Sequence, residues 1–416
     1  MSQLPEINME RVEMHLEHLR RFSATYGEGV TRLTYTSEYR QACDYFISQC
    51  RHLGLEIRTD AIGNIFATWH GRHPEQKKIL VGSHLDTVVN GGHLDGILGV
   101  VAGLEVVQTM QESNIEIDNS IEIACFAEEE GINFRCPLAG SKLIMGEVES
   151  QSLLALTDRD GRSYADVLQE YGLNPMDLDK ARLDASQYKA MVELHIEQGV
   201  VLEQENTNIG VVSCIAGSYN CDMTFDGISN HAGAIPMPLR FDALAGAAEY
   251  IQKVEAYAKQ SSSETLVSTV GRITCIPNAA NVIPRKVTLA LDIRDIENPV
   301  LDTAEQQLKQ CLYEVGDSRK LGVSYSIKSY SRPIQLDKDV VELVRSHTEN
   351  RGYSYKMMHS GALHDAAIFA GQIPTAMIFV PSIGGRSHVP EEETKREDIE
   401  KGVNILLDTV ISLSQG

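Results

Sequence analysis

The sequence predicts a mixed α/β protein in which a smaller α+β domain interrupts a larger α/β domain. The chain has 416 residues, more than a single hydrophobic core normally serves. Up to about residue 210, and again after about residue 330, short apolar runs alternate with segments of helical periodicity. Between these points the order becomes strand, strand, helix, strand, strand, helix, strand, which is typical of a unit with one antiparallel sheet. We therefore expect one domain from residues 1–211 and 331–416 and an inserted domain at 212–330.

The first part of the chain is expected to supply most of the strands of the larger domain. Apolar residues recur at helical spacing from residue 9 onward, and Ser37 is a plausible N-cap for the next helix. The expected helices are 9–26, 37–53 and 95–112, the expected strands are 55–58, 64–69, 79–83, 121–127 and 191–196, and 157–187 is expected to be partly helical.

The inserted domain and the last part of the chain follow the same reasoning. The inserted domain is expected to contain strands at 210–215, 221–225, 264–273, 286–294 and 323–329 and helices at 240–259 and 301–316. The larger domain is then expected to resume with helices at 339–350, 363–370 and 394–413 and a strand at 375–380.

Composition and charge exclude several classes of function. A formal net charge of −21 disfavours nucleic acid and anionic membranes as partners. No apolar stretch approaches the roughly 20 residues that a bilayer span needs, and the start of the sequence shows no secretory signal. The eight cysteines include no Cys-x-x-Cys pair, so we expect a cytoplasmic protein with free thiols. Neither glycine-rich phosphate-binding motif is present, so nothing indicates a nucleotide.

Polar residues at the ends of apolar runs point to metal chemistry. His84 with Asp95, the triplet 128–130, His195 and His388 each follow such a run. Carboxylates crowded at a strand end repel one another unless a cation or a proton relieves them, although such a run alone is usually a solvated loop. Nitrogen and oxygen ligands without thiolates suit zinc, manganese or cobalt, and Asp86 is placed to orient the imidazole of His84. Two cations bridged by one carboxylate would form a hydrolytic site, with a spare carboxylate to move the proton.

Six motifs, in this order, carry a family resemblance. They are Gly82-Ser83-His84-Leu85-Asp86-Thr87, Gly92-His93-Leu94-Asp95-Gly96, Glu129-Glu130-Gly131, Glu193-Leu194-His195-Ile196-Glu197-Gln198-Gly199, Asn230-His231-Ala232-Gly233 and Ser387-His388. Together they resemble the amidase/hydantoinase/carbamoylase group of dinuclear metallohydrolases over residues 30 to 400. The resemblance implies an aminopeptidase-like catalytic domain with two divalent metal ions (Zn, Mn or Co), and an inserted α+β lid through which the protein forms a homodimer.

The resemblance also implies a role for individual residues. One metal would be held by His84, Asp95 and His195, and the other by Asp95, Glu130 and His388. Glu129 would be the general base and then the general acid, with Asp86 supporting His84. Gln198 would contact the substrate, His231 would stabilise the oxyanion across the dimer, and Asn281 with Arg294 would bind the substrate carboxylate. An ion pair of Arg294 with Asp292 or Asp295 is the alternative, His93 is expected to be a loop residue, and His364 and Asp365 are expected to support the site without binding metal.

The implied reaction is hydrolysis of a carbamoyl or ureido C–N bond in a small carboxylate substrate. Met358-His359-Ser360-Gly361 is more similar to the allantoate enzymes, so we expect allantoate, with release of ammonia and CO2. The alternatives are an N-carbamoyl-L-amino-acid hydrolase or β-ureidopropionase and, less favoured, a dipeptidase or aminopeptidase. A binding protein without turnover is disfavoured by the intact Glu129. The sequence departs from the family's pattern at Tyr219, Asn220, Ala234, Ile235, Phe241, Leu363 and Arg386, which concerns the substrate pocket and not the reaction class.

Overall fold

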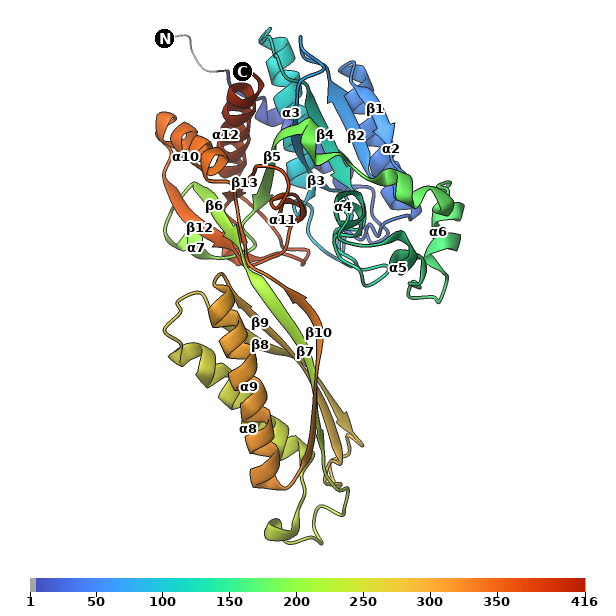
Figure 1. Cartoon of the computed structure of the whole chain (residues 1–416), viewed down its shortest axis with the longest axis vertical. Helices are drawn as coiled ribbons and strands as arrows, with labels where there is room; N and C mark the ends of the chain where they lie inside the picture. The colour runs from blue at the N-terminus through green and yellow to red at the C-terminus, as the bar shows by residue number, and fades with distance from the viewer. Residues whose placement is uncertain (1–4, 416) are drawn as a thin grey trace. The chain divides into compact units, whose positions relative to one another are not determined.

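The chain folds into two compact units. The computed structural model describes residues 5–415 (Figure 1), and the first four residues, on which the prediction about a secretory signal partly rests, lie outside this range. Unit 1 comprises the chain up to Ser213 and from Gln335 onward, and unit 2 comprises Cys214–Ile334. The predicted boundaries were 211/212 and 330/331. The lid and dimerisation roles of the inserted unit stay predictions.

Unit 1 is built on a nine-stranded mixed sheet. Its main path runs β1-β2-β4-β3-β5-β13-β6-β11, and β12 pairs with β6. The strands are β1 (Glu56–Thr59), β2 (Ile65–Trp69), β3 (Lys78–His84), β4 (Ile121–Phe126), β5 (Tyr188–Ile196), β6 (Ile209–Ile215), β11 (Ile334–Gln335), β12 (Tyr355–Ser360) and β13 (Thr375–Val380). β3 is parallel to β4 and β5, and β13 is parallel to β5. The carboxyl ends of these four strands therefore meet at one edge of the sheet.

Strand β6 corrects one element of the sequence prediction. The sequence assigned residues 210–215 to the inserted domain, but β6 pairs antiparallel with β13, where Met377 lies opposite Val212. Val211 and Val212 are both fully buried, as expected of a strand covered on both faces. The short β11 and the half-buried β12 were not predicted, because neither has an apolar run that marks a core strand.

Helices cover both faces of this sheet. Side chains of β5 alternate, so that Leu194 meets Gly402 of α12 (Arg396–Ser414) while the carboxylate of Glu193 accepts a hydrogen bond from Ala366 of α11 (Asp365–Phe369). Helix α3 (Ile97–Glu112) lies close against the sheet at Gly99, where a Cβ atom would come within 2.6 Å of the Leu194 carbonyl oxygen. Only glycine fits at such an approach.

The helices of unit 1 match most of the predicted segments. They are α1 (Met9–Arg20), α2 (Ser37–His52), α3 (Ile97–Glu112), α4 (Ala139–Met145), α5 (Ser150–Leu154), α6 (Tyr164–Glu170), α7 (Val201–Gln204), α10 (Lys338–Asn350), α11 (Asp365–Phe369) and α12 (Arg396–Ser414), with short 3₁₀ turns η1 (Pro175–Ala181), η2 (Ala185–Gln187) and η4 (Ile383–Gly385). The predicted N-cap of α2 was wrong by one residue. Thr36 is extended, and its hydroxyl accepts the Tyr39 N–H at 3.3 Å, so Thr36 caps the helix and Ser37 is already helical.

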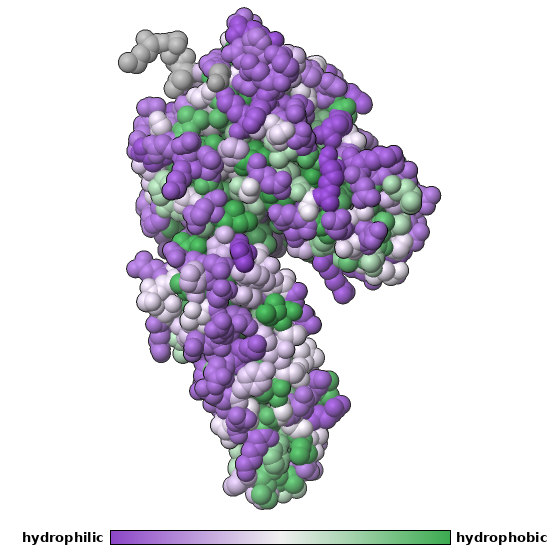
Figure 2. All heavy atoms as spheres, viewed as in Figure 1, coloured by the Kyte–Doolittle hydropathy of each residue, from purple (hydrophilic) through white to green (hydrophobic). Residues whose placement is uncertain are grey.

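Unit 2 is an antiparallel sheet with two helices on one face. Its strands β7 (Gly217–Asp226), β8 (Val267–Ile276), β9 (Lys286–Asp295) and β10 (Gly322–Ser331) follow the order β10-β7-β9-β8, and its helices are α8 (Ala243–Gln260), η3 (Met237–Leu239) and α9 (Asn298–Arg319). Alternate residues of β9 are buried in the core of this unit, which α8 and α9 cover. Figure 2 shows hydrophobic residues at the end of unit 2 that holds the segment between β7 and α8, where Ile228, Met237 and Leu239 are exposed.

Two further observations concern the whole described chain. Among residues 5–415, none of the helices combines the length and apolar character that a bilayer span requires. All eight cysteines are free thiols.

Candidate active site

Residues at or after the ends of four strands meet at the carboxyl edge of the sheet in unit 1. His84 is the last residue of β3, His195 lies at the end of β5, and Glu129 with Glu130 follows β4. His388 follows β13 after one 3₁₀ turn. This edge is where open α/β sheets place their ligand sites.

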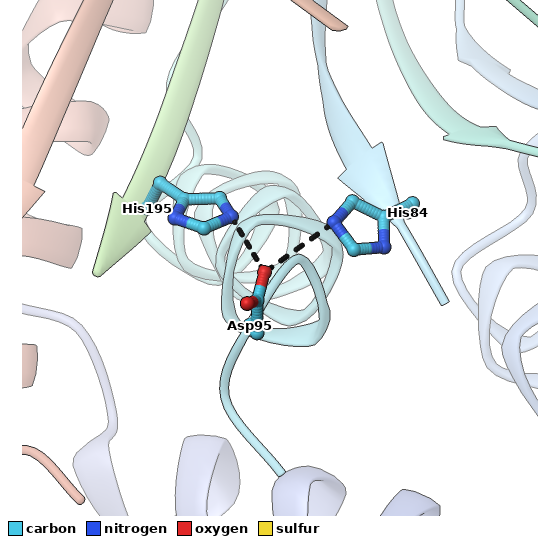
Figure 3. A group of neighbouring side chains, drawn as sticks. All are labelled: His84, Asp95 and His195. Carbon is cyan, nitrogen blue, oxygen red and sulfur yellow. Dashed lines mark ion pairs between the residues drawn. The ribbon is translucent and has the colours of Figure 1, made fainter. Parts of the chain in front are cut away.

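Asp95 joins two groups of side chains. Its Oδ1 lies 3.1 Å from Nε2 of His195 and 3.6 Å from Nε2 of His84 (Figure 3), and its Oδ2 lies 3.1 Å from Nε2 of His388. Glu130 lies 3.7 Å from the same nitrogen of His388. Potential ligand atoms lie within 4.8 Å of one another in the group His84, Asp95, His195 and in the group Asp95, Glu130, His388. The structure thus brings together both predicted ligand sets, with one oxygen of Asp95 facing each.

The two buried histidines present lone pairs to Asp95. Nδ1 of His84 donates to the carbonyl oxygen of Asp86 at 3.0 Å, and Nδ1 of His195 donates to the carbonyl oxygen of Ile196 at 2.9 Å. Because a carbonyl only accepts, Nδ1 carries the proton in each neutral ring and Nε2 is left as the acceptor. Nε2 of His195 also accepts the Gly96 N–H at 3.2 Å. Neither acceptor nitrogen can interact favourably with the Asp95 carboxylate unless a proton or a cation lies between them.

Asp86 supports the site by two routes. Its carbonyl orients His84, whereas its carboxylate lies 3.8 Å from the ring, farther than the sequence led us to expect. That carboxylate instead accepts the backbone N–H groups of Glu129 at 3.3 Å and Glu130 at 3.1 Å. Asp86 therefore holds the acidic loop as well as the histidine. The carboxylate of Glu129 lies 3.5 Å from Nε2 of His84, next to the first ligand group.

The site holds an excess of buried negative charge. Burial raises the pKa of Glu129 well above its usual value, and Glu130 beside it adds to the effect. Burial, followed by the charge of Asp95, raises the pKa of Glu130 to about 7. Burial alone would lower the pKa of His84, but Glu129 and the neighbouring aspartates raise it well above its usual value. The hydrogen bond to Asp95 raises the pKa of His388 to about 9. The cationic partners of these carboxylates within the described residues are histidines.

This donor set fits two divalent cations. The donors are imidazole nitrogens and carboxylate oxygens, which suit zinc, manganese or cobalt. A cation at each group would satisfy the histidine lone pairs and the buried carboxylates at once. His84, Asp95 and His195 would hold one ion, and Asp95, Glu130 and His388 the other.

A third cluster lies behind the first group. Glu193 and His364 lie close to His195, but each already has partners within the protein. Glu193 accepts from the Ser83 hydroxyl at 2.7 Å and from the Ala366 N–H at 2.9 Å, and Nε2 of His364 lies 2.9 Å from the Ser360 hydroxyl. His364 directly precedes α11, where we expected it to support the site.

Gln198 is turned toward the same aspartate. Its Nε2 donates to Oδ2 of Asp95 at 2.7 Å and to the Ser387 hydroxyl at 3.2 Å, while its Oε1 is buried without a hydrogen-bond partner. Its backbone has φ +57°, which is uncommon outside glycine and is often found at functional sites.

The three predicted substrate residues of unit 2 divide into two places. His231 and Asn281 are exposed neighbours, because His231 bridges to Val282 and the Ala232 N–H donates to the Asn281 carbonyl at 3.0 Å. Arg294 is half-buried on β9 and pairs with Asp292 at 2.8 Å, the alternative that the sequence left open.

Sequence reasoning gave no role to two buried carboxylates beside the site, Glu193 and Glu392. Glu193 lies within an apolar run, where alternation could have shown that it shares a face with His195. Glu392 lies in the run 391–393, which is typical of solvated charge, yet its middle residue is buried. No local signal in the sequence marks that burial.

Comparison with known proteins identifies the family. Residues 80–412 match peptidase family M20/M25/M40. The chain belongs to this family. M20 members are generally metal-dependent, which agrees with the donor groups at the sheet edge, and the chain is a hydrolase that acts on C–N bonds.

Relatives whose names state an activity match almost the whole chain. It is 37% identical over 414 residues to the N-carbamoyl-L-amino-acid amidohydrolase of Paenarthrobacter aurescens, covering 99% of this chain and 100% of that protein. It is 36% identical over 398 residues to the allantoate amidohydrolase of Escherichia coli K12, covering 95% and 96%. A crystal structure of a hydantoinase/carbamoylase family amidase from Burkholderia multivorans matches with a TM-score of 0.92 at 32% identity, covering 99% of both chains. The M20 amidase/carbamoylase fold and a carbamoyl or ureido amidohydrolase activity follow from these similarities.

Proposed function

We propose that this chain is a dinuclear metal amidohydrolase whose preferred substrate is allantoate, hydrolysed with release of ammonia and CO2. The observation that carries the proposal is Asp95, whose two oxygens face two ligand groups, with Glu129 beside the first of them. A carboxylate shared between two such groups, with a second carboxylate free to carry a proton, is the arrangement that hydrolysis of an unactivated C–N bond needs.

The chain's own residues supply the proton transfer. Two divalent metals held here would polarise the carbamoyl carbonyl and lower the pKa of a water molecule. Glu129 would take the proton of that water and give it to the leaving nitrogen. The backbone N–H of Glu129 donates to the carboxylate of Asp86, whose carbonyl also orients His84. Asp86 therefore fixes the position of Glu129 relative to His84 during the transfer.

Gln198 and, by the family resemblance, three residues of unit 2 carry polar groups suited to a ureido carboxylate. The unpartnered Oε1 of Gln198 is available to accept an N–H of a ureido group. By the family resemblance, Arg294 and Asn281 would bind the carboxylate and His231 would stabilise the oxyanion. Arg294 forms a bidentate ion pair with Asp292. This contact shows that its guanidinium can present two parallel N–H groups to a carboxylate.

An N-carbamoyl-L-amino-acid hydrolase is the second candidate. The similarity to the Paenarthrobacter aurescens N-carbamoyl-L-amino-acid amidohydrolase favours this activity as strongly as the similarity to the Escherichia coli enzyme favours allantoate. Both substrates are small carboxylates with a ureido group, so the same metal site and base would serve either one.

We also propose a homodimer formed through unit 2. Ile228, Met237 and Leu239 are 54%, 74% and 67% exposed, which is a large apolar surface for one segment in water. His231 lies in this same segment, which agrees with its implied role across a dimer. Sedimentation of the wild type and of a Met237→Glu/Leu239→Glu variant tests this, since the variant should be monomeric. The cytoplasmic localisation expected from the sequence stays a prediction.

The substrate test uses manganese-loaded protein and its Glu129→Gln variant. Ammonia release is measured with allantoate, a series of N-carbamoyl-L-amino acids and β-ureidopropionate, and metal content is measured in parallel. We expect allantoate to be turned over fastest, and the variant to lose roughly 10²–10⁴-fold in rate with unchanged metal content. Faster turnover of a carbamoyl amino acid would replace the substrate and keep the mechanism. Unchanged turnover by Glu129→Gln would overturn the mechanism.

A further inference from the structure

The carboxylate of Glu392 joins two loops of the metal site that are far apart in the sequence. Its Oε1 accepts the backbone N–H groups of Leu94 at 2.8 Å and Asp95 at 3.0 Å. Its Oε2 accepts the Ser387 hydroxyl at 3.0 Å and faces the His388 N–H at 3.4 Å. One oxygen therefore binds the loop of Asp95 and the other binds the loop of His388.

The local fold directs only this glutamate inward. The Glu392 N–H donates to the carbonyl of Val389 at 3.1 Å, which forms a turn that brings the side chain back over its own loop. Glu392 is 1% exposed, whereas its neighbours Glu391 and Glu393 are exposed. A carboxylate this buried is retained only where hydrogen bonds satisfy it, and here the donors belong to the two loops.

The Asp95 loop is shaped to receive this side chain. A Cβ atom added at Gly92 would lie 2.1 Å from Oε1 and 2.3 Å from Cβ of Glu392. The second of these contacts involves the base of the side chain, which cannot swing away as its far end could. Glycine at position 92 is therefore part of the same contact.

The loop of His388 needs such support. His388 has φ +61°, a backbone conformation that costs roughly 1 kcal/mol or more outside glycine and persists only when its surroundings hold it. The Ser387 hydroxyl lies 2.9 Å from Oδ2 of Asp95 and 3.0 Å from Glu392, and it has one proton to donate between them. The distance between Asp95 and His388 thus depends on the group that both loops share.

We propose that Glu392 is a positioning residue that sets the spacing between Asp95 and His388 and thereby the affinity of the second metal position. Glu392 belongs to neither ligand group and acts through the two loops that it joins. The inference rests on the proposed function only in requiring an ion at Asp95, Glu130 and His388. Glutamine would keep an acceptor for the N–H groups of Leu94 and Asp95, but it would remove the negative charge and place an NH2 group against the His388 N–H, which that group cannot accept.

The test is metal binding by the full-length chain, without any substrate. Metal-free wild type, Glu392→Gln and the matched control Glu391→Gln are titrated with Co2+, which is followed by calorimetry and by visible absorption. We expect wild type and Glu391→Gln to bind two ions alike. Glu392→Gln should bind the first ion as wild type does and the second roughly 10–100-fold more weakly, with an altered spectrum for that ion.

A second pair of variants separates positioning from general stability. Gly92→Ala should weaken the second ion in the same way, because its methyl group would displace the Glu392 side chain. Glu392→Asp, which is shorter by one methylene, should restore part of that affinity when combined with Gly92→Ala. The proposal would be overturned if this rescue failed and the melting temperature of the metal-free protein fell equally in Glu392→Gln, Gly92→Ala and the double variant. Glu392 would then have a merely structural role.

The outcomes also separate this inference from the proposed function. Two ions bound with equal affinity by wild type and Glu392→Gln would overturn the role of Glu392 alone. A wild-type chain that binds only one ion would overturn both the dinuclear function and this inference.

Discussion

Buried carboxylates at the two ends of the central sheet differ in the groups that neutralise them. At the amino ends of β3, β4 and β5, Glu122 accepts hydrogen bonds from Lys78 and Thr68, both at 2.8 Å, and from the hydroxyl of Tyr188. Burial alone would raise the pKa of Glu122, but the Lys78 ammonium lowers it below its usual value. At the carboxyl ends, burial raises the pKa values of Glu129 and Glu130, and their cationic partners are histidines.

This difference indicates which acidic cluster is a cation site. A buried carboxylate that the chain neutralises with its own lysine is complete in the folded protein. Buried carboxylates that face the lone pairs of histidines still need positive charge, and an exchangeable ion can supply it. Changes at the Glu122 end should therefore act independently of metal, and changes at the Asp95 end should depend on it.

Removal of metal should give the largest effect, and only at the Asp95 end. Chelation should abolish C–N bond hydrolysis and lower the free energy of unfolding, by about 2.7 kcal/mol for each bound ion relative to protein at an ion concentration 100 times Kd. Turnover and urea unfolding with and without EDTA measure this. Full turnover after exhaustive chelation would contradict the assignment.

Lys78→Met should destabilise the protein independently of metal. It leaves the Glu122 carboxylate buried without its cation, and since Lys78 is 30% exposed we expect a loss of roughly 2–3 kcal/mol, below that for a fully buried pair. Urea unfolding checks this, with the exposed neighbour Lys77→Met as the control. An equal change in both variants would show that Lys78 does not neutralise Glu122.

Glu130→Gln should change stability in opposite directions with and without metal. The folded-state pKa of Glu130 is raised to about 7, so its charge opposes folding at pH 8, and its removal should stabilise the metal-free protein by up to about 3 kcal/mol. With metal in excess the variant should be less stable than wild type, because one ligand is lost. A variant that is as stable as wild type with metal in excess would contradict a metal role for Glu130.

The Glu122 end should also show a pH dependence of definite sign. Because the folded-state pKa of Glu122 lies below its usual value of 4.5, its stabilisation is present above that pH and is lost as the pH falls through the folded-state pKa. The difference in unfolding free energy between wild type and Glu122→Gln should be constant from about pH 8 to 6 and shrink below pH 4.5. A difference that grows on acidification would have the wrong sign.

Much of the fold followed from apolar periodicity, and the exceptions have local causes. The strand 375–380 was predicted with its observed bounds, and β3 and β4 were predicted to within a residue. Helix α3 begins at Ile97, two residues later than expected, because Gly96 takes φ +71° where a Cβ atom would lie 2.3 Å from Nε2 of His84. No local pattern shows such a contact between separate loops.

The candidate site was predictable where each residue directly follows an apolar run. His84 and His195 have that signature, His388 follows its apolar run only after a short turn, and the family resemblance joined all three to Asp95 and Glu130. Glu392 has no signature of its own, since its burial depends on a turn that folds against a loop nearly 300 residues away. The use of the Asp86 carbonyl, in place of its carboxylate, at His84 is likewise a matter of backbone geometry.

The place of β13 has a consequence for synthesis of the chain on the ribosome. This strand lies between β5 and β6 in the middle of the large sheet, but it is translated after the whole of unit 2. At roughly 5–20 residues per second, β5 and β6 wait on the order of ten seconds or more for their common neighbour. During that time their facing edges are open to incorrect pairing, which chaperones or rapid folding must prevent. All four strands of unit 2 have by then been made, so the inserted unit can close its core before the sheet that carries the metal ligands.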